Sequence, residues 1–315
     1  MNASFIQRVS VTSALTLIFT ISSANAAAYS WTEILIPSIG PLGYAAGPND
    51  RGQVAVTSAD GSKTGIYRGG IFTRLPLPPA GYKVSAMAIN DGGTIVGGAF
   101  SPSDPTHEQG FILIGSKYTF FSRPGWDNTE PRAIANSGLI TGYNSTSDLS
   151  TTAGFIYNAG TNTFTDATPP GSGTGFSATQ GMNADGRISG DGRSDELGRY
   201  AFIWQQGTLV RGARELAPFL ARFKITDAGS AARGINDAGV IVGFTGRPDG
   251  TAVGFVGSDS QGFQLLIPPG GDAPGAIVVC EGINNLGQVV CLVTDAVGNN
   301  RDFIGTPDAN DQKDR

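Results

Sequence analysis

The chain has 315 residues, with 21 Lys or Arg against 26 Asp or Glu, so its formal net charge at pH 7 is −5. This negative balance disfavours nucleic acids and anionic membrane surfaces as partners, because both attract basic proteins. A hydrophobic fraction of 40% lets a chain of this length bury a large core.

The first 26 residues have the pattern of an export signal. Arg8 supplies a positive start, residues 11–24 are mostly apolar, and Ala24, Asn25 and Ala26 form an A-x-A cleavage site. A retained membrane anchor is the weaker alternative, since the apolar run is short and interrupted by Ser and Thr. We therefore expect a mature chain of residues 27–315 outside the cytoplasm, with no membrane span and a strongly polar tail at residues 306–315.

One turn-centred motif then recurs six times. Its clearest copy, residues 234–243, contains an Asn-Asp-x-Gly turn followed by β-branched residues and a closing Gly. The turn-opening position falls, at intervals of 41 to 53 residues, at Asn49, Asn90, Ala135, Asn183, Asn236 and Asn284. An Asn at this position can accept a hydrogen bond from the backbone two residues later, and a Gly three residues later can adopt positive φ. Each copy is therefore predicted to be a β-hairpin.

Each copy continues with a Gly-Phe-like strand, and in the copies before the sixth a fourth strand follows. One unit of about 48 residues thus holds four short strands, the spacing of propeller blades. The sixth unit lacks a fourth strand, whereas residues 29–37 resemble a fourth strand with no unit before them. The predicted fold is all-β: one six-bladed β-propeller domain of four-stranded antiparallel blades, its ring closed when residues 29–37 join the last blade. An open solenoid would instead need polar capping units.

The residue two positions before each turn is always small. It is Gly or Ala in every copy: Gly47, Ala88, Ala133, Gly181, Gly234 and Gly282. This pattern predicts that neighbouring backbones crowd together near the axis of the ring. A general bias toward Gly and Ala is the alternative, but the small residues keep phase with the turns.

These residues resemble a known family. The pattern A-x-G-I-N-x-x-G-x-V-V-G, with the later G/A-F strand and L-x-x-P strand, is similar to the HAF repeat of bacterial extracellular repeat proteins, and its best copies are residues 233–243 and 88–97. The resemblance covers nearly all of the mature chain and implies a propeller-like fold and a secreted or cell-surface bacterial protein. It implies no reaction. Some relatives end in a sorting tail with a hydrophobic helix, and its absence here favours release over anchoring.

The two cysteines stand on either side of the sixth turn. If four loop residues, 284–287, connect the strands, Cys280 lies directly opposite Cys291. Small residues occupy nearly all of the same two positions in the other copies, and the chain is predicted to be exported. A disulfide is therefore expected, with buried free thiols as the alternative. Metal binding by the pair is disfavoured because no His or third Cys is nearby.

One position of the innermost strand varies while its neighbours stay small or apolar. Three residues before the turn stand Ala46, Met87, Arg132, Gln180, Arg233 and Glu281. If this position faces the central channel, Arg132, Arg233 and Glu281, with Gln180 and Met87, form a polar ring able to hold an anionic or sugar-like ligand. The alternative is that these side chains only solvate the channel mouth or pair with one another.

Other candidate sites are weak. His107, the one histidine, stands in a polar loop without a G-x-S-x-G turn, so a solvated loop histidine is favoured over a catalytic triad. Residues 191–196 offer acidic oxygens but lack the spacing of a calcium-binding EF-hand loop. No catalytic residue, metal site or cofactor is predicted.

The sequence favours a non-enzymatic, monomeric extracellular module, secreted or periplasmic, that recognises a glycan, matrix component or surface protein. A polysaccharide hydrolase or lyase with a site in the channel is the alternative, because paired carboxylates need no sequence motif. Two carboxylates roughly 5–10 Å apart at one channel mouth would favour the enzyme.

Overall fold

The computed structural model describes residues 28–168, 177–194, 198–205, 208–210, 219, 221 and 229–308. The predicted signal peptide, residues 1–26, and most of the polar tail lie outside these ranges.

The described residues form an all-β structure with 24 strands. Four sheets have four antiparallel strands each, in chain order. The first contains β2 (Leu42–Ala45), β3 (Val54–Ser58), β4 (Thr64–Arg68) and β5 (Ile71–Arg74). The second contains β6 (Lys83–Ile89), β7 (Ile95–Phe100), β8 (Gln109–Ile114) and β9 (Lys117–Phe121). The third contains β10 (Asn128–Ile134), β11 (Leu139–Ser145), β12 (Thr152–Asn158) and β13 (Thr163–Asp166). The fourth contains β14 (Ser177–Met182), β15 (Ile188–Ser194), β16 (Gly198–Gln205) and β17 (Thr208–Val210).

The remaining strands form one eight-stranded sheet of two antiparallel halves. One half contains β18 (Ser230–Ile235), β19 (Ile241–Gly246), β20 (Ala252–Ser258) and β21 (Gly262–Leu266). The other contains β22 (Ile277–Ile283), β23 (Val289–Thr294), β24 (Asn300–Pro307) and the N-terminal strand β1 (Tyr29–Glu33). A single parallel pair, Ala252 with Ile277, joins the halves. β1 lies antiparallel to β24, with Tyr29 opposite Pro307 and Glu33 opposite Phe303. The first strand of the described chain is therefore the fourth strand of the half that contains β22, β23 and β24.

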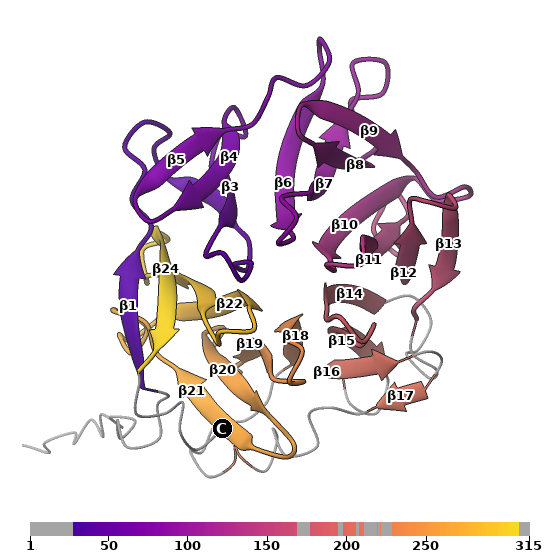
Figure 1. The fold of residues 1–315 in the computed structure, drawn as a ribbon. Coiled ribbons are helices and arrows are strands. Elements are labelled where there is room, and N and C mark those ends of the chain that lie inside the picture. The colour runs from indigo at the N-terminus through magenta and orange to yellow at the C-terminus, as the bar shows by residue number, and fades with distance from the viewer. Residues whose placement is uncertain are drawn as a thin grey trace, which may run out of the picture.

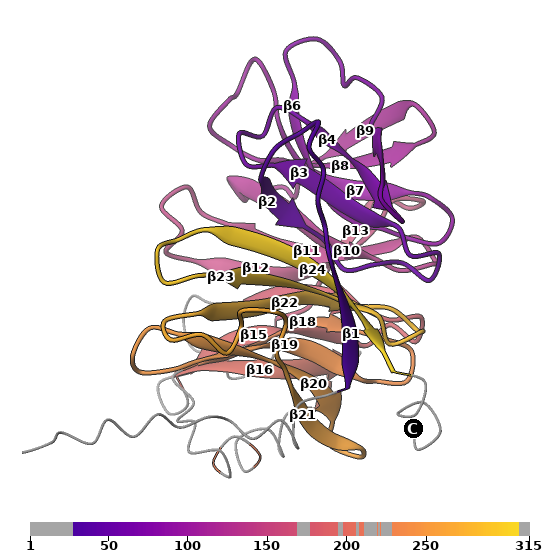
Figure 2. The same ribbon diagram turned by 90° about the vertical axis from the view of Figure 1, so that its left-hand side faces the viewer.

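The sheets are arranged in a propeller-like way around a common centre. Figure 1 shows β6, β10, β14, β18 and β22 nearest that centre, with the later strands of each set farther out. Consecutive sets touch through the pairs β3 and β6, β7 and β10, β11 and β14, β15 and β18, and β19 and β22, while β24 touches β2. Figure 2 shows the sheets from the side, with β1 next to β24.

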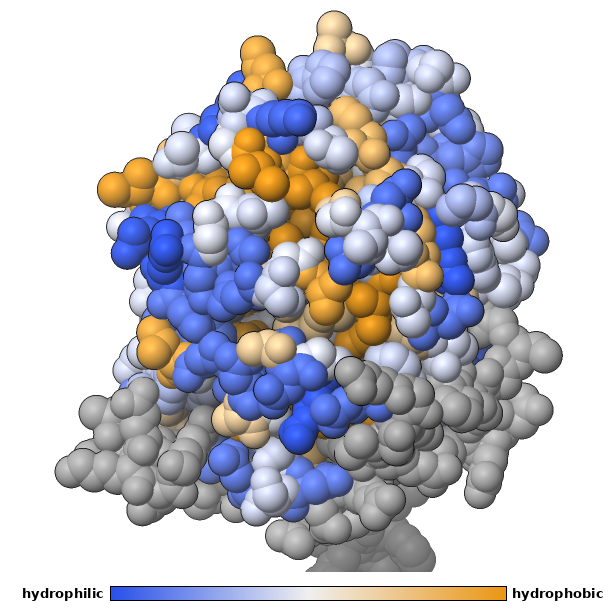
Figure 3. Space-filling model, turned by 45° about the vertical axis from the view of Figure 1, so that its right-hand side comes forward, coloured by the Kyte–Doolittle hydropathy of each residue, from blue (hydrophilic) through white to orange (hydrophobic). Residues whose placement is uncertain are grey.

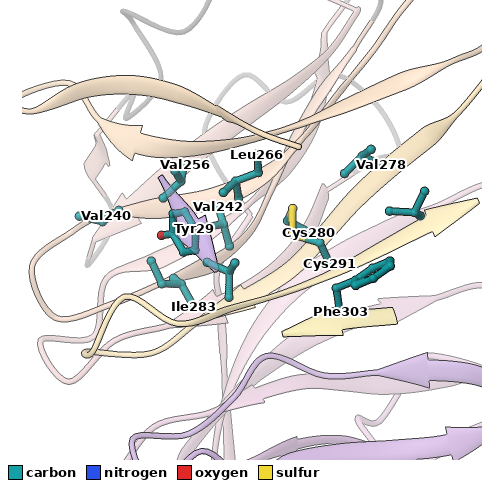
Figure 4. Close-up of a cluster of buried hydrophobic side chains, with 12 residues drawn as sticks. Tyr29, Val240, Val242, Val256, Leu266, Val278, Cys280, Ile283, Cys291 and Phe303 are labelled. Carbon is teal, nitrogen blue, oxygen red and sulfur yellow. A yellow bond between two sulfur atoms is a disulfide. The ribbon is translucent and has the colours of Figure 1, made fainter. Parts of the chain in front are cut away.

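The core lies between neighbouring sheets. The phenylalanine of the Gly-Phe-like strand is fully buried there in five units: Phe111, Phe155, Phe202, Phe255 and Phe303. Figure 4 shows a cluster between the two halves of the eight-stranded sheet, in which Tyr29 of β1 and Phe303 of β24 pack near the cysteine pair. Burial of one such ring contributes about 1.5–3 kcal/mol, so these positions hold adjacent sheets together.

The predicted disulfide between Cys280 and Cys291 is confirmed, with an S–S distance of 2.07 Å. The two residues are cross-strand partners, as expected. The assumed four-residue loop is wrong, however, because Ile283 pairs with Val289 and leaves five residues, 284–288, in the turn. A β-bulge at Glu281 shifts the register by one residue and brings the cysteines back opposite each other.

The turns have the chemistry that their sequence predicts. Asn49 Oδ1 accepts hydrogen bonds from the backbone N–H groups of Arg51 and Gln53, and Asn284 does the same in the sixth turn. The turn glycine has positive φ in all six copies, between 69° at Gly52 and 86° at Gly138. A residue with a Cβ would be strained there.

The same asparagines also connect one turn to the next. Asn49 Nδ2 donates to the carbonyl of Asn90 at 3.0 Å, Asn90 to Ala135, Asn183 to Asn236, Asn236 to Asn284, and Asn284 back to Asn49 at 2.9 Å. Only Ala135 has no side-chain amide, so the step from Ala135 to Asn183 lacks this bond. The fourth turn is therefore less firmly attached to the third than the other turns are to their neighbours.

Crowding at the small position of the inner strands is confirmed. A Cβ on Gly234 would lie 2.6 Å from Gly282 Cα, and one on Gly47 would lie 2.7 Å from the same atom. A Cβ on Gly181 would lie 2.9 Å from Gly234 Cα. Backbones of neighbouring inner strands thus touch directly at this level.

The variant Gly234→Ala tests this contact. We expect it to lower the free energy of unfolding by about 1–3 kcal/mol, because the backbone of Gly282 cannot move without displacing its own sheet. Urea denaturation would measure the loss. The control is Gly246→Ala, where the new Cβ meets nothing closer than 3.5 Å. Equal losses in the two variants would contradict the steric explanation.

The variant Ala135→Asn tests the missing turn contact. A side-chain amide at this position would cap its own turn and donate to the carbonyl of Asn183, so we expect a gain of about 0.5–1.5 kcal/mol in stability. Asn90→Ala, which removes an existing contact of the same kind, should lose a similar or larger amount. Thermal unfolding measures the stability of both variants. A destabilised Ala135→Asn protein would show that the absent inter-turn hydrogen bond does not limit stability at this position.

Candidate functional site

A repeated β-bulge places one side chain from five of the six inner strands at the centre of the molecule. The register of each strand pair shifts by one residue three positions before the turn, at Met87, Arg132, Gln180, Arg233 and Glu281. A bulge re-aims the side chain of the extra residue. All five residues, which the sequence predicts to face the channel, line one cavity of about 100 Å³.

The first inner strand contributes differently. Ala46 stands at the equivalent position but is buried in an apolar cluster, and Tyr44 of β2 lines the cavity instead. We name this cavity, with its six side chains from Tyr44, Met87, Arg132, Gln180, Arg233 and Glu281, the channel pocket. Sequence reasoning missed Tyr44 because it lies two residues outside the repeated position.

An apolar layer forms the floor of the channel pocket. The residue just before each turn lines both this pocket and a second cavity among the turns: Pro48, Ile89, Ile134, Met182, Ile235 and Ile283. These six side chains therefore separate the two cavities. The channel pocket combines polar walls with an apolar floor on the side that faces the turns, an arrangement typical of small-ligand sites.

Arg132 is the most extensively bonded group in the pocket. Its Nε donates to Gln180 Oε1 at 3.0 Å, and its Nη1 donates to Glu130 Oε1 at 3.2 Å. Its Nη2 donates to the Tyr44 hydroxyl at 3.3 Å and lies 3.6 Å from Glu281 Oε2. The guanidinium also stacks over the Tyr44 ring at 5.0 Å. Only 10% of its side chain is exposed. Through these contacts the guanidinium of Arg132 connects four inner strands.

A carboxyl pair lies beside Arg132. Burial, together with the negative charge of Glu130, raises the pKa of Glu108 to about 8, although Arg132 opposes the shift. Burial and Glu130 also raise the pKa of Tyr143. A Cβ on Gly98 would overlap the carboxyl group of Glu108, so this glycine makes the space that the acid occupies. Near neutral pH, Glu108 is thus a protonated acid next to the ion pair of Glu130 and Arg132.

A second carboxyl pair lies on the other side of the pocket. Burial and the negative charge of Glu281 raise the pKa of Asp302 to about 7. Glu281 has 14% of its side chain exposed, and its Oε2 is buried without a hydrogen bond. Neither Glu108 nor Asp302 lines the pocket itself. No sequence pattern marked them, because the packing of adjacent sheets places Glu108, and the pairing of strands within one sheet places Asp302.

Arg233 differs sharply from Arg132. Its guanidinium stacks over the Phe244 ring at 5.5 Å, and its Nε is buried without a hydrogen-bond partner. Within the described part of the chain it forms no ion pair, although it lines the same pocket as Glu281. The wall around Arg233 and Glu281 therefore keeps hydrogen-bonding capacity that the protein does not use.

The remaining candidates do not form a site. His107 Nδ1 lies 3.0 Å from Asp104 Oδ2 in a partly exposed loop, and no serine hydroxyl is bonded to its ring among the described residues. Residues 191–196 are expected from the sequence to be a solvated loop, but this is wrong for Asp191, which lies in strand β15, is fully buried and pairs with Arg199 at 2.7 Å. In the described ranges no group of three or more His, Cys, Asp or Glu residues is arranged to hold a metal ion.

Within the described residues, no helix is long and apolar enough to cross a membrane.

Figure 3 shows that apolar side chains gather in a band across one face of the molecule, bordered by hydrophilic ones. Single exposed apolar residues such as Leu77 and Val297 are normal on a protein surface.

Similar proteins are found by structure and not by sequence. No protein-family model and no curated protein matches the sequence. A protein from Bacteroides fragilis is similar in structure, with a TM-score of 0.53 and 8% identity over 91% of this chain and 98% of that one. A fucose-recognising lectin from Aleuria aurantia, described as a six-bladed β-propeller, gives a TM-score of 0.47 and 12% identity, covering 82% of this chain and 90% of the lectin.

A virginiamycin B lyase from Staphylococcus aureus gives a TM-score of 0.42 and 10% identity, covering 88% of this chain and 99% of the lyase. The similarity to the Bacteroides protein concerns the fold alone, because the identity is low. The lectin and the lyase, both below a TM-score of 0.5, establish no function for this chain. The class defined by fold and pocket is a propeller-like all-β protein with a polar central cavity.

The raised pKa of Glu108 predicts a pH-dependent stability. In the unfolded chain this carboxyl ionises near 4.5, whereas in the folded protein it stays protonated until about pH 8. The contribution of Glu108 to the free energy of unfolding is therefore complete below pH 4.5 and is lost as the pH rises toward 8. We expect Glu108→Gln, which is neutral at every pH, to remove at least about 1 kcal/mol of this decline.

Thermal melting between pH 4.5 and 8.5 would measure the slope for both proteins. Asp185→Asn, in an exposed turn, is the control and should leave the slope unchanged. An unchanged slope in Glu108→Gln would show that Glu108 is ionised throughout the range.

Proposed function

We propose that the chain is a six-bladed β-propeller. The two halves of the eight-stranded sheet count as two blades, since one parallel residue pair alone joins them. The pairing of β1 with β24, the contact of β24 with β2, and the bond from Asn284 to Asn49 support a ring closed by the N-terminal strand. We also propose that it belongs with the HAF-repeat proteins, on the motif that recurs at each turn.

The proposed function is that of an extracellular or periplasmic bacterial binding module, acting as a monomer. The export pattern of residues 1–26 and the disulfide between Cys280 and Cys291 support this location, since disulfides persist in oxidising compartments. The net negative charge argues against nucleic acid as the partner. A glycan or a surface protein carrying a small polar group fits better.

The ligand site is the channel pocket, and Arg233 is the observation that carries this assignment. The Nε of Arg233 is buried without a hydrogen-bond partner, and a polar group in that state costs free energy, whereas a ligand that supplied an acceptor would recover it. The pocket volume of about 100 Å³ limits the bound part to a small group, such as a terminal sugar fragment or an organic acid. The binding reaction needs no cofactor.

A polysaccharide hydrolase or lyase is the second candidate, and Glu108 is the observation that favours it. A protonated carboxyl beside the ionised partner of an arginine has the properties of a general acid. The binding module ranks first because Glu108 and Glu130 do not line the pocket where a substrate would sit.

The two functions separate in one set of experiments. The purified mature chain is screened on a glycan array and against small organic acids, and each hit is repeated with Arg233→Ala. We expect at least a tenfold loss of affinity, the size of one charge-assisted hydrogen bond. Arg51→Ala, on an exposed turn at the other end of the channel, is the matched control.

Unchanged binding in Arg233→Ala would remove the channel pocket as the site, and the absence of any hit would count against a binding module. Release of reducing ends or unsaturated sugars from a polysaccharide, abolished in Glu108→Gln, would instead establish the enzyme.

A further inference from the structure

The free hydrogen-bonding groups of the channel pocket are confined to one side. Arg132 interacts with both Met87 and Gln180, because its Nη1 lies 3.7 Å from Met87 Sδ and its Nε donates to Gln180 Oε1. Arg233 and Glu281, on the next two inner strands, do not pair with each other within the described chain, and each keeps one buried atom without a hydrogen bond, Nε and Oε2. The pocket thus has a satisfied half and an unsatisfied half.

Arg233 and Glu281 start from adjacent backbone positions. The residues that follow them, Gly234 and Gly282, touch through their backbones, since a Cβ on Gly234 would lie 2.6 Å from Gly282 Cα. One cation and one anion therefore enter the same small cavity from neighbouring strands. Arg233 is held by the Phe244 ring at 5.5 Å, and Glu281 by the charge of Arg132 at 3.6 Å.

This arrangement selects for a ligand with two opposite charges. A simple anion would satisfy Arg233 but would lie near the carboxylate of Glu281, and a simple cation would meet the reverse problem. A molecule with a carboxylate for Arg233 and an ammonium group for Glu281 complements both at once. The apolar floor beneath them, formed in part by Ile235 and Ile283, suits a short aliphatic group.

We propose that the unsatisfied half of the channel pocket binds a small zwitterion, an α-amino acid with a short aliphatic side chain. This inference rests on the proposed binding function of the same pocket. The carboxylate lies against the Arg233 guanidinium, the ammonium group donates to Glu281, and the side chain faces the apolar floor. The cavity of about 100 Å³ has room for glycine or alanine but not for an aromatic amino acid.

Isothermal titration calorimetry of the unmodified mature chain tests this directly. The probes are alanine, lactate, which has a hydroxyl in place of the ammonium group, alaninamide, which lacks the carboxylate, and a methyl glycoside. We expect alanine to bind at least about tenfold more tightly than lactate or alaninamide, because each lacks one charge-assisted contact. Equal affinities for the three would overturn the proposal.

Two variants locate the effect. Glu281→Gln keeps the shape of the side chain but removes its charge, so it should abolish the preference for alanine over lactate while lactate still binds. Asp185→Asn, at an exposed turn on the opposite end, should leave every affinity unchanged. A preference that survives in Glu281→Gln would overturn the assigned role of that carboxylate.

The test also separates this inference from the proposed function. Binding of the methyl glycoside or of another screened ligand without alanine, lost in Arg233→Ala, would overturn the zwitterion and leave the binding module standing. Absence of binding by every probe and by the screened glycans and acids would overturn both.

Discussion

Direct backbone contact between neighbouring inner strands is the constraint on which the rest of the structure depends. At Gly47, Gly181, Gly234 and Gly282 there is no room for a side chain, because a Cβ would lie only 2.5 to 2.9 Å from the Cα of a neighbouring strand. Strands this close to an axis leave only a narrow central space. In five of the six inner strands the residue before the small position is a bulge, so its side chain turns into that space and not into a sheet.

This constraint explains why the sequence predicts the repeat so well. Each turn needs an Asn as its cap, a Gly with positive φ and a small residue where the backbones crowd together. These needs are local, so the same residue types recur at fixed spacing along the sequence. The position of Arg132, Arg233 and Glu281 follows from the same spacing, since one structural register places all three at the axis. Local chemistry and position in the repeat are thus sufficient to find these side chains.

The contacts of those side chains are not local and could not be predicted. Glu108 lies in the loop before β8, and it meets Arg132 only because two sheets pack face to face. Asp302 reaches Glu281 across its own sheet. Tyr44 lines the pocket in place of Ala46, and the bulge of β2 lies at Gly43 and not at Ala46. The disulfide shows the same limit, since the pairing of Cys280 with Cys291 follows from the repeat, whereas the extra turn residue and the bulge that offset each other do not.

The contrast between the two channel arginines bears most directly on function. Arg132 lies among carboxylates, an amide and a phenol that compensate the loss of its hydration, so the fold is able to neutralise a buried guanidinium when stability requires it. Arg233, on an equivalent bulge two strands away, receives only the face of Phe244. Its buried Nε, which has no hydrogen-bond partner, costs the folded protein free energy unless an acceptor is supplied. The adjacent carboxylate of Glu281 forms no ion pair with it in the described chain, and this difference from Arg132 is the basis of the binding site proposed above.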